Sequence, residues 1–318
     1  YGNSYRYTIT TGGHENSWDL NPPSDVAFVE QTFRLLLRYS QILNMDADHL
    51  DFFKDIDDIR HSFRKFAELL PANGVLIINS DIHDYKEICD GLPIKVITVG
   101  SDPAKSHYSA ADVTFNENAC ATYTLLEDGK AIDTITLGVP GIHNVYNSLA
   151  SIAAAHELGI RGEGIKNGLL RFTGTHRRFE KKGEIGGVTI IDDYAHHPQE
   201  IAATLSAAKN YPHREIWCVF QPHTYTRTKA LMEDFAKALS TADHVVLADI
   251  YAARETDNLG ISSGTLAEKI AALGTDTHYF PSFDAIETFL LENCVNGDLL
   301  ITMGAGDIVK VGEKLLGQ

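Results

Sequence analysis

The sequence predicts an α/β fold in two consecutive domains, and two observations support this prediction. Its 318 residues exceed the roughly 150 of a common domain, so each half can bury a core of its own. In the C-terminal half, short apolar runs alternate with helix-like stretches, a pattern typical of a doubly wound, mainly parallel sheet. The predicted strands are residues 188–191, 216–220, 244–248, 277–280 and 299–303, and the predicted helices are 199–208, 228–239, 265–273, 283–292 and a last one after Asp307.

The N-terminal half predicts a second, more mixed α/β unit. Residues 75–79 and 94–99 are apolar enough for buried strands, and a shorter run at 41–44 predicts another. Residues 55–70 repeat apolar side chains at the period of a helix. This half therefore also combines strands with at least one amphipathic helix.

The rest of this half predicts a hairpin followed by a helix. Segments 123–126 and 132–137 alternate in polarity around Asp128-Gly129, a dipeptide typical of two-residue hairpin turns. The Ala-rich residues 144–158 predict a helix, which Gly159 ends. Residues 1–40 show no clear period.

Gly174-Thr175, just before a pair of arginines, is the predicted hinge between the two domains. We place the first domain at residues 1–176 and the second at residues 177–318. A hinge there would let the domains close on a ligand.

Composition limits the function classes. Lys and Arg number 27 against 43 Asp and Glu, which gives a net charge of −16. A general binder of nucleic-acid polymers or acidic membranes needs clustered positive charge, so we expect neither partner. A small anionic ligand needs only a few nearby hydrogen-bond donors, so the net charge does not exclude binding of such a ligand.

The sequence shows no recognisable targeting signal, and this and the spacing of its cysteines predict a cytoplasmic protein. The four cysteines are far apart and form no C-x-x-C pair, which argues against a disulfide scaffold or a zinc ribbon. No apolar run reaches about 18 residues, and the chain opens at Tyr1 without the pattern of a signal peptide. We therefore expect a cytoplasmic protein with reduced thiols.

The densest polar cluster is residues 192–198, directly after a predicted strand. Ligands of open α/β sheets bind at the carboxyl ends of strands, so Asp193, Tyr194 and His196 are candidate site residues. Carboxylates, a phenol and imidazoles can bind a sugar or a cation, or move a proton. The alternative is that Asp193 and the Pro198 turn cap the next helix.

A second cluster, residues 221–228, follows the next strand. His223 and Arg227 are four residues apart, so they share a face in a helical first turn. Arginine near a helix N-terminus suits a phosphate or a carboxylate. An exposed arginine beside a turn histidine is the alternative.

Two further motifs lie in the N-terminal half. Residues 46–51 hold three aspartates and His49 after a predicted strand, which suits Mg²⁺ or Mn²⁺ as well as a solvated acidic turn. Asn144 and Asn147 share one face where the Ala-rich helix opens, and their amides can bind the edge of a base. Helix capping by Asn144 is the simpler reading of that motif.

Several common catalytic motifs are absent from the sequence. It contains no G-x-S-x-G, no H-E-x-x-H and no G-x-G-x-x-G after a strand. It also contains no P-loop of the form G-x-x-x-x-G-K-[ST].

Taken together, these motifs resemble those of the ATP-dependent Mur ligases of bacterial cell-wall synthesis, from about residue 41 to the C-terminus. The resemblance rests on residues 44–51, 141–147, 176–180, 192–198 and 220–228, which occur in order and at suitable spacing. It implies a central ATPase-type α/β domain, here from after its P-loop, followed by a Rossmann-like C-terminal domain. The two histidine-rich motifs favour the branch of the family that joins L-alanine to UDP-N-acetylmuramate.

The resemblance also implies an activity and its residues. ATP would activate the muramyl carboxylate as an acyl phosphate, and the amine of alanine would attack it. Carried over onto this sequence, the implied roles are as follows: His143, Asn144, Asn147 and Arg177 bind the nucleotide; His49 and Glu30 bind Mg²⁺; Asp193, Tyr194, His196, His223 and Arg227 bind substrate, with His196, His223 and Arg227 catalytic.

Departures from the family pattern keep other readings open. Glu30 is not followed by the usual acidic pattern, and its distance to Asp48 is short. Without a P-loop, we expect these 318 residues alone to have little or no ligase activity. The alternatives are a muramyl ligase that recycles a tripeptide, and a non-catalytic module that binds muramyl nucleotide. The sequence leaves the oligomeric state open.

Overall fold

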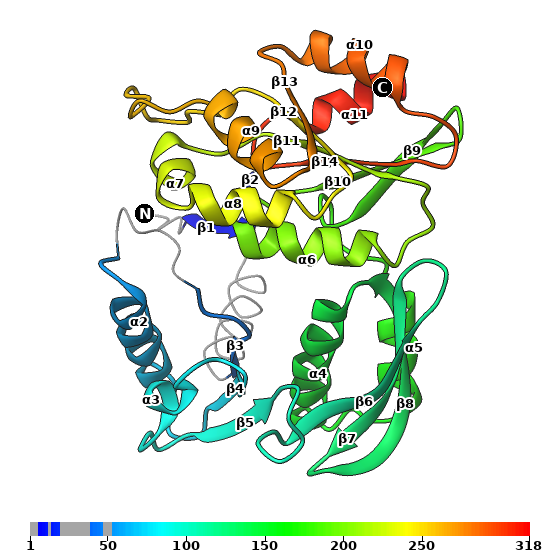
Figure 1. The fold of residues 1–318 in the computed structure, drawn as a ribbon. Helices are drawn as coiled ribbons and strands as arrows, with labels where there is room; N and C mark the ends of the chain where they lie inside the picture. Colours follow the sequence, from blue (N-terminus) through cyan, green and yellow to red (C-terminus); the bar gives the residue numbers. More distant parts are fainter. Residues whose placement is uncertain (1–5, 12–13, 20–38, 47–52) are drawn as a thin grey trace.

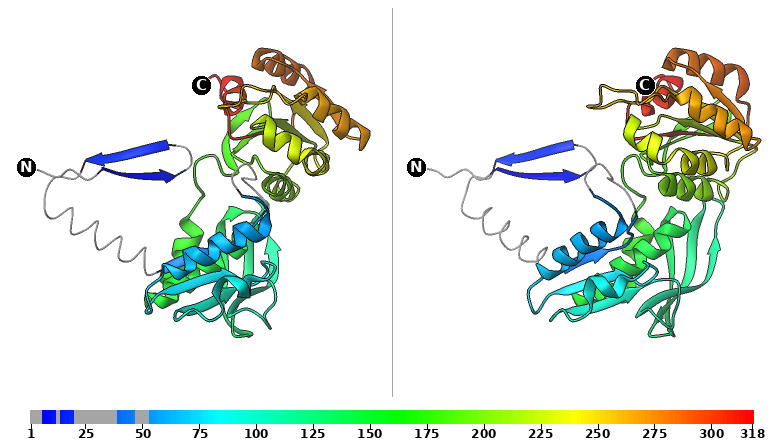
Figure 2. Two further views of the ribbon diagram at one scale, coloured as in Figure 1. Left: turned by 90° about the vertical axis from the view of Figure 1, so that its left-hand side faces the viewer. Right: turned by 60° about the vertical axis from the view of Figure 1, so that its left-hand side comes forward.

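The computed structural model describes residues 6–11, 14–19, 39–46 and 53–318. Two six-stranded sheets each form the centre of one domain, and the domains are stacked one above the other (Figure 1). A separate two-stranded antiparallel ribbon, β1 (Arg6–Thr11) with β2 (His14–Asp19), lies beside them (Figure 2). The predicted α/β architecture is confirmed.

The first sheet combines parallel and antiparallel pairing. Its strand order is β3-β4-β5-β6-β7-β8, parallel from β3 to β6 and antiparallel from β6 to β8. The bounds are β3 (Tyr39–Ile42), β4 (Val75–Asn79), β5 (Lys95–Val99), β6 (Tyr108–Phe115), β7 (Cys120–Glu127) and β8 (Lys130–Pro140).

Helices cover both faces of this sheet and complete its core. On one face, α4 (Ile142–Glu157) buries Val145, Leu149 and Ile152 among the strand side chains, and α5 (Glu163–Arg171) contacts β8. On the other face, α2 (Ile56–Glu68) and α3 (Tyr85–Cys89) close a second apolar cluster. The N-terminus of α4 then lies at the edge that faces the second domain (Figure 1).

The second domain is a three-layer α/β/α sandwich. Its sheet order is β13-β12-β11-β14-β10-β9, all parallel except the edge strand β9. The strands are β9 (Glu180–Ile185), β10 (Val188–Asp193), β11 (Ile216–Phe220), β12 (His244–Leu247), β13 (Asp276–Tyr279) and β14 (Leu299–Met303). The helices are α6 (Pro198–Ala208), α7 (Tyr225–Ala230), α8 (Met232–Leu239), α9 (Ser263–Ala272), α10 (Phe283–Asn293) and α11 (Val309–Leu315).

Each face of this sheet has its own apolar cluster. Leu205 of α6, Phe235 of α8 and Leu266 of α9 pack on one face. Ile286 of α10 and Val311 of α11 pack on the other. Parallel strands covered on both sides explain the continuous apolar runs seen in the sequence.

The predicted helix at 228–239 is wrong, because this segment forms two helices. Leu231, with φ −111° and ψ 21°, separates α7 from α8. The break lets α8 bury Phe235, Ala236 and Leu239 against the sheet, while α7 begins earlier, at Tyr225. The helical period of apolar side chains therefore did not reveal that the helix axis changes at Leu231.

The two domains meet where α4 begins. A Cβ built on Gly141 would lie 3.2 Å from the Ala207 Cβ of α6, so the helices of the two domains approach closely here. Gly141 has φ +93°, a backbone conformation that a side chain would strain. This approach fixes α6 above the opening of α4.

Candidate functional site

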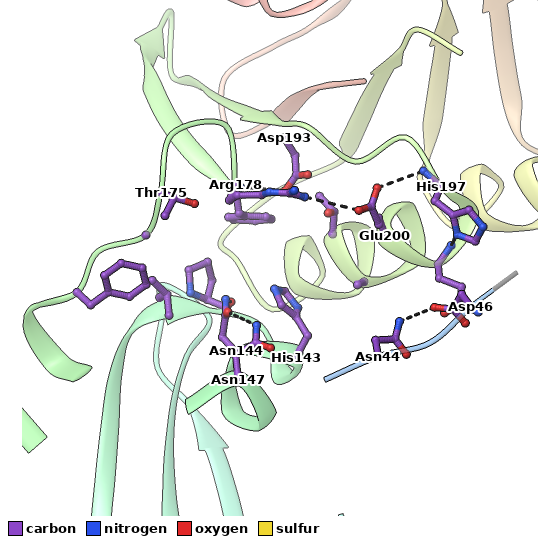
Figure 3. A pocket seen from close by; sticks show the side chains of 18 residues that line it. Asn44, Asp46, His143, Asn144, Asn147, Thr175, Arg178, Asp193, His197 and Glu200 are labelled. Carbon is purple, nitrogen blue, oxygen red and sulfur yellow. Dashed lines mark hydrogen bonds and ion pairs between the residues drawn. The ribbon is translucent and has the colours of Figure 1, made fainter. Parts of the chain in front are cut away.

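A cavity of about 660 Å³ lies between the two domains. Figure 3 shows its wall: the opening of α4 on one side, and the end of β10 with α6 on the other. Its polar lining residues are Asn44, Asp46, His143, Asn144, Asn147, Thr175, Arg178, Asp193, His197, Gln199, Glu200 and Thr204. Predicted site residues from both halves of the sequence therefore share one cavity.

The first domain contributes two coupled amides. The Asn144 side chain donates to the Pro140 carbonyl at 2.8 Å and accepts from the Asn147 Nδ2 at 3.1 Å. The N-cap of α4 is Gly141, so the alternative that Asn144 caps this helix is wrong. The amide pair is held at the cavity, with Asn147 exposed to it.

His143 stands beside this pair. Its Nδ1 is buried and has no hydrogen-bond partner among the described residues. Burial lowers the pKa of His143, and the Arg178 cation across the cavity lowers it further. His143 is therefore neutral near pH 7, and its buried Nδ1 lacks a hydrogen-bond partner among the described residues.

The second domain contributes a buried carboxyl group. Asp193 accepts hydrogen bonds from the Phe179 amide at 2.9 Å and from the Ala195 amide at 2.8 Å. Burial raises its pKa to about 6, although these hydrogen bonds oppose the shift. A carboxyl group with such a pKa at the wall of a cavity is typical of functional sites.

His197 and Glu200 cap α6, so the alternative that Asp193 provides the cap is wrong. The His197 ring accepts from the Gln199 amide, and the Glu200 carboxylate accepts from the amides of His196 and His197. Glu200 also forms an ion pair with Arg178 at 3.7 Å. Proline at the first helical position followed by glutamate was the sequence signal for this cap.

Beyond the cavity, predicted substrate residues form a row of rings along the carboxyl edge of the sheet. The ring centroids of Tyr194 and His196 are 5.6 Å apart, and those of His196 and His223 are 6.0 Å apart. Tyr251, after β12, stacks on His223 at 5.6 Å. Three strand ends thus bring these residues together, and sequence reasoning had not assigned Tyr251 to the site.

His223 and Arg227 interact as the i, i+4 spacing predicts. Arg227 Nη1 donates to His223 Nδ1 at 3.4 Å. Burial lowers the pKa of His223 to about 4, with further lowering by Arg227 and His196. Since arginine can only donate, neutral His223 carries its proton on Nε2.

The two arginines at the domain boundary have different surroundings. Arg177 pairs with the fully buried Asp192 at 2.7 Å and donates to the carbonyls of Gly304 and Gly306. Arg178 is half exposed and lines the cavity. Nucleotide binding by Arg177 stays a prediction, and Arg178 is the arginine that the structure places at the cavity.

The predicted metal site is only partly visible. Asp46 lines the cavity, and its carboxylate accepts a hydrogen bond from the side-chain amide of Asn44. Glu30 and His49 lie outside the described residues. Within the described ranges, no three His, Cys, Asp or Glu side chains gather closely enough to hold a metal ion. Metal binding by His49 and Glu30 stays a prediction.

Comparisons with known families agree with the two sheets. A family model described as the Mur ligase middle domain matches residues 29–155, and one described as the Mur ligase, glutamate ligase domain matches residues 177–306.

No helix in the described part of the chain has the length and hydropathy that a bilayer span requires.

Curated relatives share high identity with the chain. It is 64% identical over 275 residues to the UDP-N-acetylmuramate--L-alanine ligase of Lachnospira eligens, covering 86% of this chain and 60% of the relative. It is 56% identical over 279 residues to the ligase of the same name from Agathobacter rectalis, covering 88% and 61%. The chain thus spans about three fifths of the length of these relatives.

Solved structures share the fold. The UDP-N-acetylmuramate-alanine ligase of Thermotoga maritima matches with a TM-score of 0.71 at 26% identity, covering 88% of this chain and 59% of that one. A murein peptide ligase of Psychrobacter arcticus matches with a TM-score of 0.61 at 22% identity, covering 88% and 57%. The second likeness concerns the fold alone.

Proposed function

Because the chain belongs to the Mur ligase family, whose middle and glutamate ligase domains match it in order, we propose a specific role for it. It forms the nucleotide- and substrate-binding cleft of a UDP-N-acetylmuramate–L-alanine ligase. The observation that carries the proposal is the 64% identity to a relative of that name. The family consists of ATP-dependent ligases. The cavity between the two domains supports the proposal, because it has the amides, cation and carboxyl group that such substrates need.

In the proposed reaction, the carboxylate of UDP-N-acetylmuramate takes the γ-phosphoryl group of ATP, which gives an acyl phosphate and ADP. The amine of L-alanine then attacks the acyl carbon and gives up a proton to solvent. The carbon–oxygen bond to the phosphoryl group breaks, phosphate leaves with the bonding electrons, and an amide bond remains. Both steps develop negative charge on oxygen, so the cleft must supply fixed donors and positive charge.

The residues on the α4 side fit a nucleobase. Asn144 and Asn147 offer amide donors and acceptors, and His143 has a buried nitrogen without a partner among the described residues. An adenine edge presents complementary donors and acceptors. Arg178, across the cavity, supplies a cation for the phosphates.

The donor set also fits Mg²⁺. Asp46 offers carboxylate oxygen at the cavity, and oxygen is the ligand that this ion prefers. By the family resemblance, His49 and Glu30 would complete the site. The ion would neutralise charge on the phosphates when bound.

On the opposite side, His223 and Arg227 would stabilise charge on the reacting oxygens or bind the alanine carboxylate. Neutral His223 offers its Nε2–H as a donor, and Arg227 adds a fixed positive charge. Tyr194 and His196 continue the row toward Asp193 at the cavity. We propose His196, His223 and Arg227 as the residues that act on the reacting groups.

The proposed setting is the cytoplasm, where ATP is available. The partners would be UDP-N-acetylmuramate and L-alanine. A net charge of −16 gives no support for a nucleic-acid polymer or an acidic membrane as a partner.

Binding of the amino acid tests this function against its alternatives. With UDP-N-acetylmuramate and a non-hydrolysable ATP analogue present, L-alanine should shift the imidazole NMR signals of His196 and His223. A tripeptide that binds more tightly than L-alanine would favour the recycling ligase. If the chain binds the muramyl nucleotide but neither L-alanine nor the tripeptide shifts these signals, it is a non-catalytic binding module. Arg227→Gln should weaken the response to L-alanine, whereas Arg161→Gln, which changes an exposed arginine of the first domain, serves as the control.

A further inference from the structure

Thr224, between His223 and α7, has an unusual backbone conformation. Its φ is +64° and its ψ is 142°. Several other described residues have positive φ without being glycine, but Thr224 is the β-branched one among them. A β-branched side chain at positive φ is a true outlier, and such strain persists only where surrounding contacts enforce it.

Those contacts come from two sides. The Thr224 amide donates to the Tyr251 carbonyl at 2.9 Å, and the Tyr251 amide donates to the Pro222 carbonyl at 2.8 Å. These bonds form an isolated parallel bridge between the loops after β11 and β12. On the other side, the fully buried Thr228 donates its hydroxyl to the Thr224 carbonyl at 2.7 Å.

The strained residue connects two groups of the proposed site. His223 precedes it, and Arg227 follows in the first turn of α7, within 3.4 Å of the His223 ring. The Thr224 hydroxyl makes no capping bond to the helix, so its backbone rather than its side chain sets this turn. A relaxed backbone at residue 224 would alter the direction of both side chains.

We propose that Thr224 is a positioning residue, whose enforced backbone holds His223 and Arg227 against each other in the geometry that the substrates require. The role in substrate binding rests on the proposed function, whereas the effect on the pair itself does not. The groups that face His223 are Arg227 on α7, His196 on the β10–α6 loop, and Glu255 and Tyr251 beyond β12.

The pKa of His223 reports this geometry directly. It is lowered to about 4 by burial first, then by Arg227 and His196, while Glu255 opposes the shift. Thr224→Gly permits the same φ without strain and also opens conformations that a Cβ forbids, so that only the hydrogen bonds to Tyr251 and Thr228 then hold the turn. In that variant the ring gains water and separates from Arg227, so its pKa should rise by about one unit toward 6.5.

The matched control is Thr224→Ala, which keeps a Cβ and so keeps the backbone restricted. NMR titration should leave its His223 pKa at about 4. Thr228→Val, which removes the hydroxyl bond to the Thr224 carbonyl, should raise the pKa as Thr224→Gly does, by a smaller amount. His244, at the opposite edge of the sheet, should titrate identically in all four proteins and shows that the domain is folded.

Two results would overturn the proposal. One is an unchanged His223 pKa in folded Thr224→Gly together with folded Thr228→Val. The other is a rise in Thr224→Ala as large as that in Thr224→Gly, which would assign the effect to the side chain.

L-alanine binding gives the functional readout. Thr224→Gly should bind L-alanine about tenfold more weakly than the unaltered chain, and Thr224→Ala within about twofold of it. Equal binding by Thr224→Gly would remove the substrate-positioning role. If the unaltered chain does not bind L-alanine either, the proposed function fails, while the pKa titration still decides whether Thr224 holds the pair.

Discussion

Arg177 and Arg178 are neighbours in the sequence with opposite surroundings, which separates a structural role from a ligand-binding role. Arg177 neutralises the fully buried Asp192, whose other oxygen accepts from the Thr302 hydroxyl. Arg178 is half exposed and its ion pair with Glu200 is long. Burial alone therefore predicts different consequences for the same substitution.

Arg177→Met should cost about 3–5 kcal/mol of unfolding free energy, because it leaves a buried carboxylate without its partner. Arg178→Met should cost less than about 1 kcal/mol and should weaken nucleotide binding instead. Urea unfolding and nucleotide titration of both variants check this pair. A stable Arg177→Met that no longer binds nucleotide would restore the direct contact implied by the family resemblance.

Asp193 should make stability depend on pH. Its pKa is raised from 3.8 to about 6 in the folded state, so between these values the native protein holds a proton that the unfolded chain releases. Stability should therefore fall as pH rises from about 4 to about 6, by about 3 kcal/mol in total. In Asp193→Asn this part of the pH dependence should disappear, whatever its absolute stability. Parallel pH profiles for both proteins would contradict the shifted pKa.

Among the elements, the edge strand β13 is connected to its neighbour β12 by the side chain of His244. His244 of β12 bonds Asp276 of β13 at 2.7 Å and Glu215 at 3.1 Å, and its ring stacks on Trp217 at 3.9 Å. Burial lowers the pKa of His244, but the hydrogen bonds with Asp276 and Glu215 outweigh it and the net pKa is raised.

Because the folded pKa of His244 lies above its ordinary 6.5, its contribution is complete below pH 6.5 and is lost as pH rises through the folded pKa. The thermal midpoint of the second domain should therefore decrease between pH 6 and pH 8.5. Asp276→Asn should flatten that decrease, since it removes one acceptor. An equal decrease in the variant would show that the contact does not stabilise the charged ring.

The apolar strands were predictable, since burial on both faces leaves a plain signal. Three predicted strands, at 75–79, 216–220 and 299–303, agree with β4, β11 and β14 at both ends. The hairpin at Asp128-Gly129 is confirmed, with Glu127 opposite Lys130. These elements follow from local pattern and turn chemistry alone.

Other elements carried weaker signals. The polar strand β9 was missed because an edge strand with charged residues lacks an apolar run. The dipeptide Gly186-Gly187, with φ +57° and +80°, was the available sign of its hairpin with β10. The site was predictable where residues follow strand ends. Tyr251 also follows a strand end and could have been assigned in the same way. That Arg178 and Glu200 face one cavity depends on which loops and helices meet across the fold, and a single sequence does not contain that information.

At the scale of the whole molecule, the 318 residues contain the cleft but no P-loop sequence. Without a lysine and backbone cradle for the β- and γ-phosphates, little or no ligation is expected from these residues alone. The assay is phosphate release with ATP, UDP-N-acetylmuramate and L-alanine. Clear turnover by a sample whose mass is confirmed as 35.0 kDa would contradict this expectation.

Nucleotide binding between the two domains can be tested by an NMR titration with a Mg²⁺-bound, non-hydrolysable ATP analogue. Signals from both walls of the cavity should move together, those of Asn144 on α4 and of Arg178 and Glu200 on the other side. Binding should require Mg²⁺ and should weaken about tenfold in Asn147→Ala, but not in Asn293→Ala on the distant α10. Shifts confined to one domain, or equal binding by both variants, would contradict the claim that this cleft is the nucleotide site of a Mur ligase.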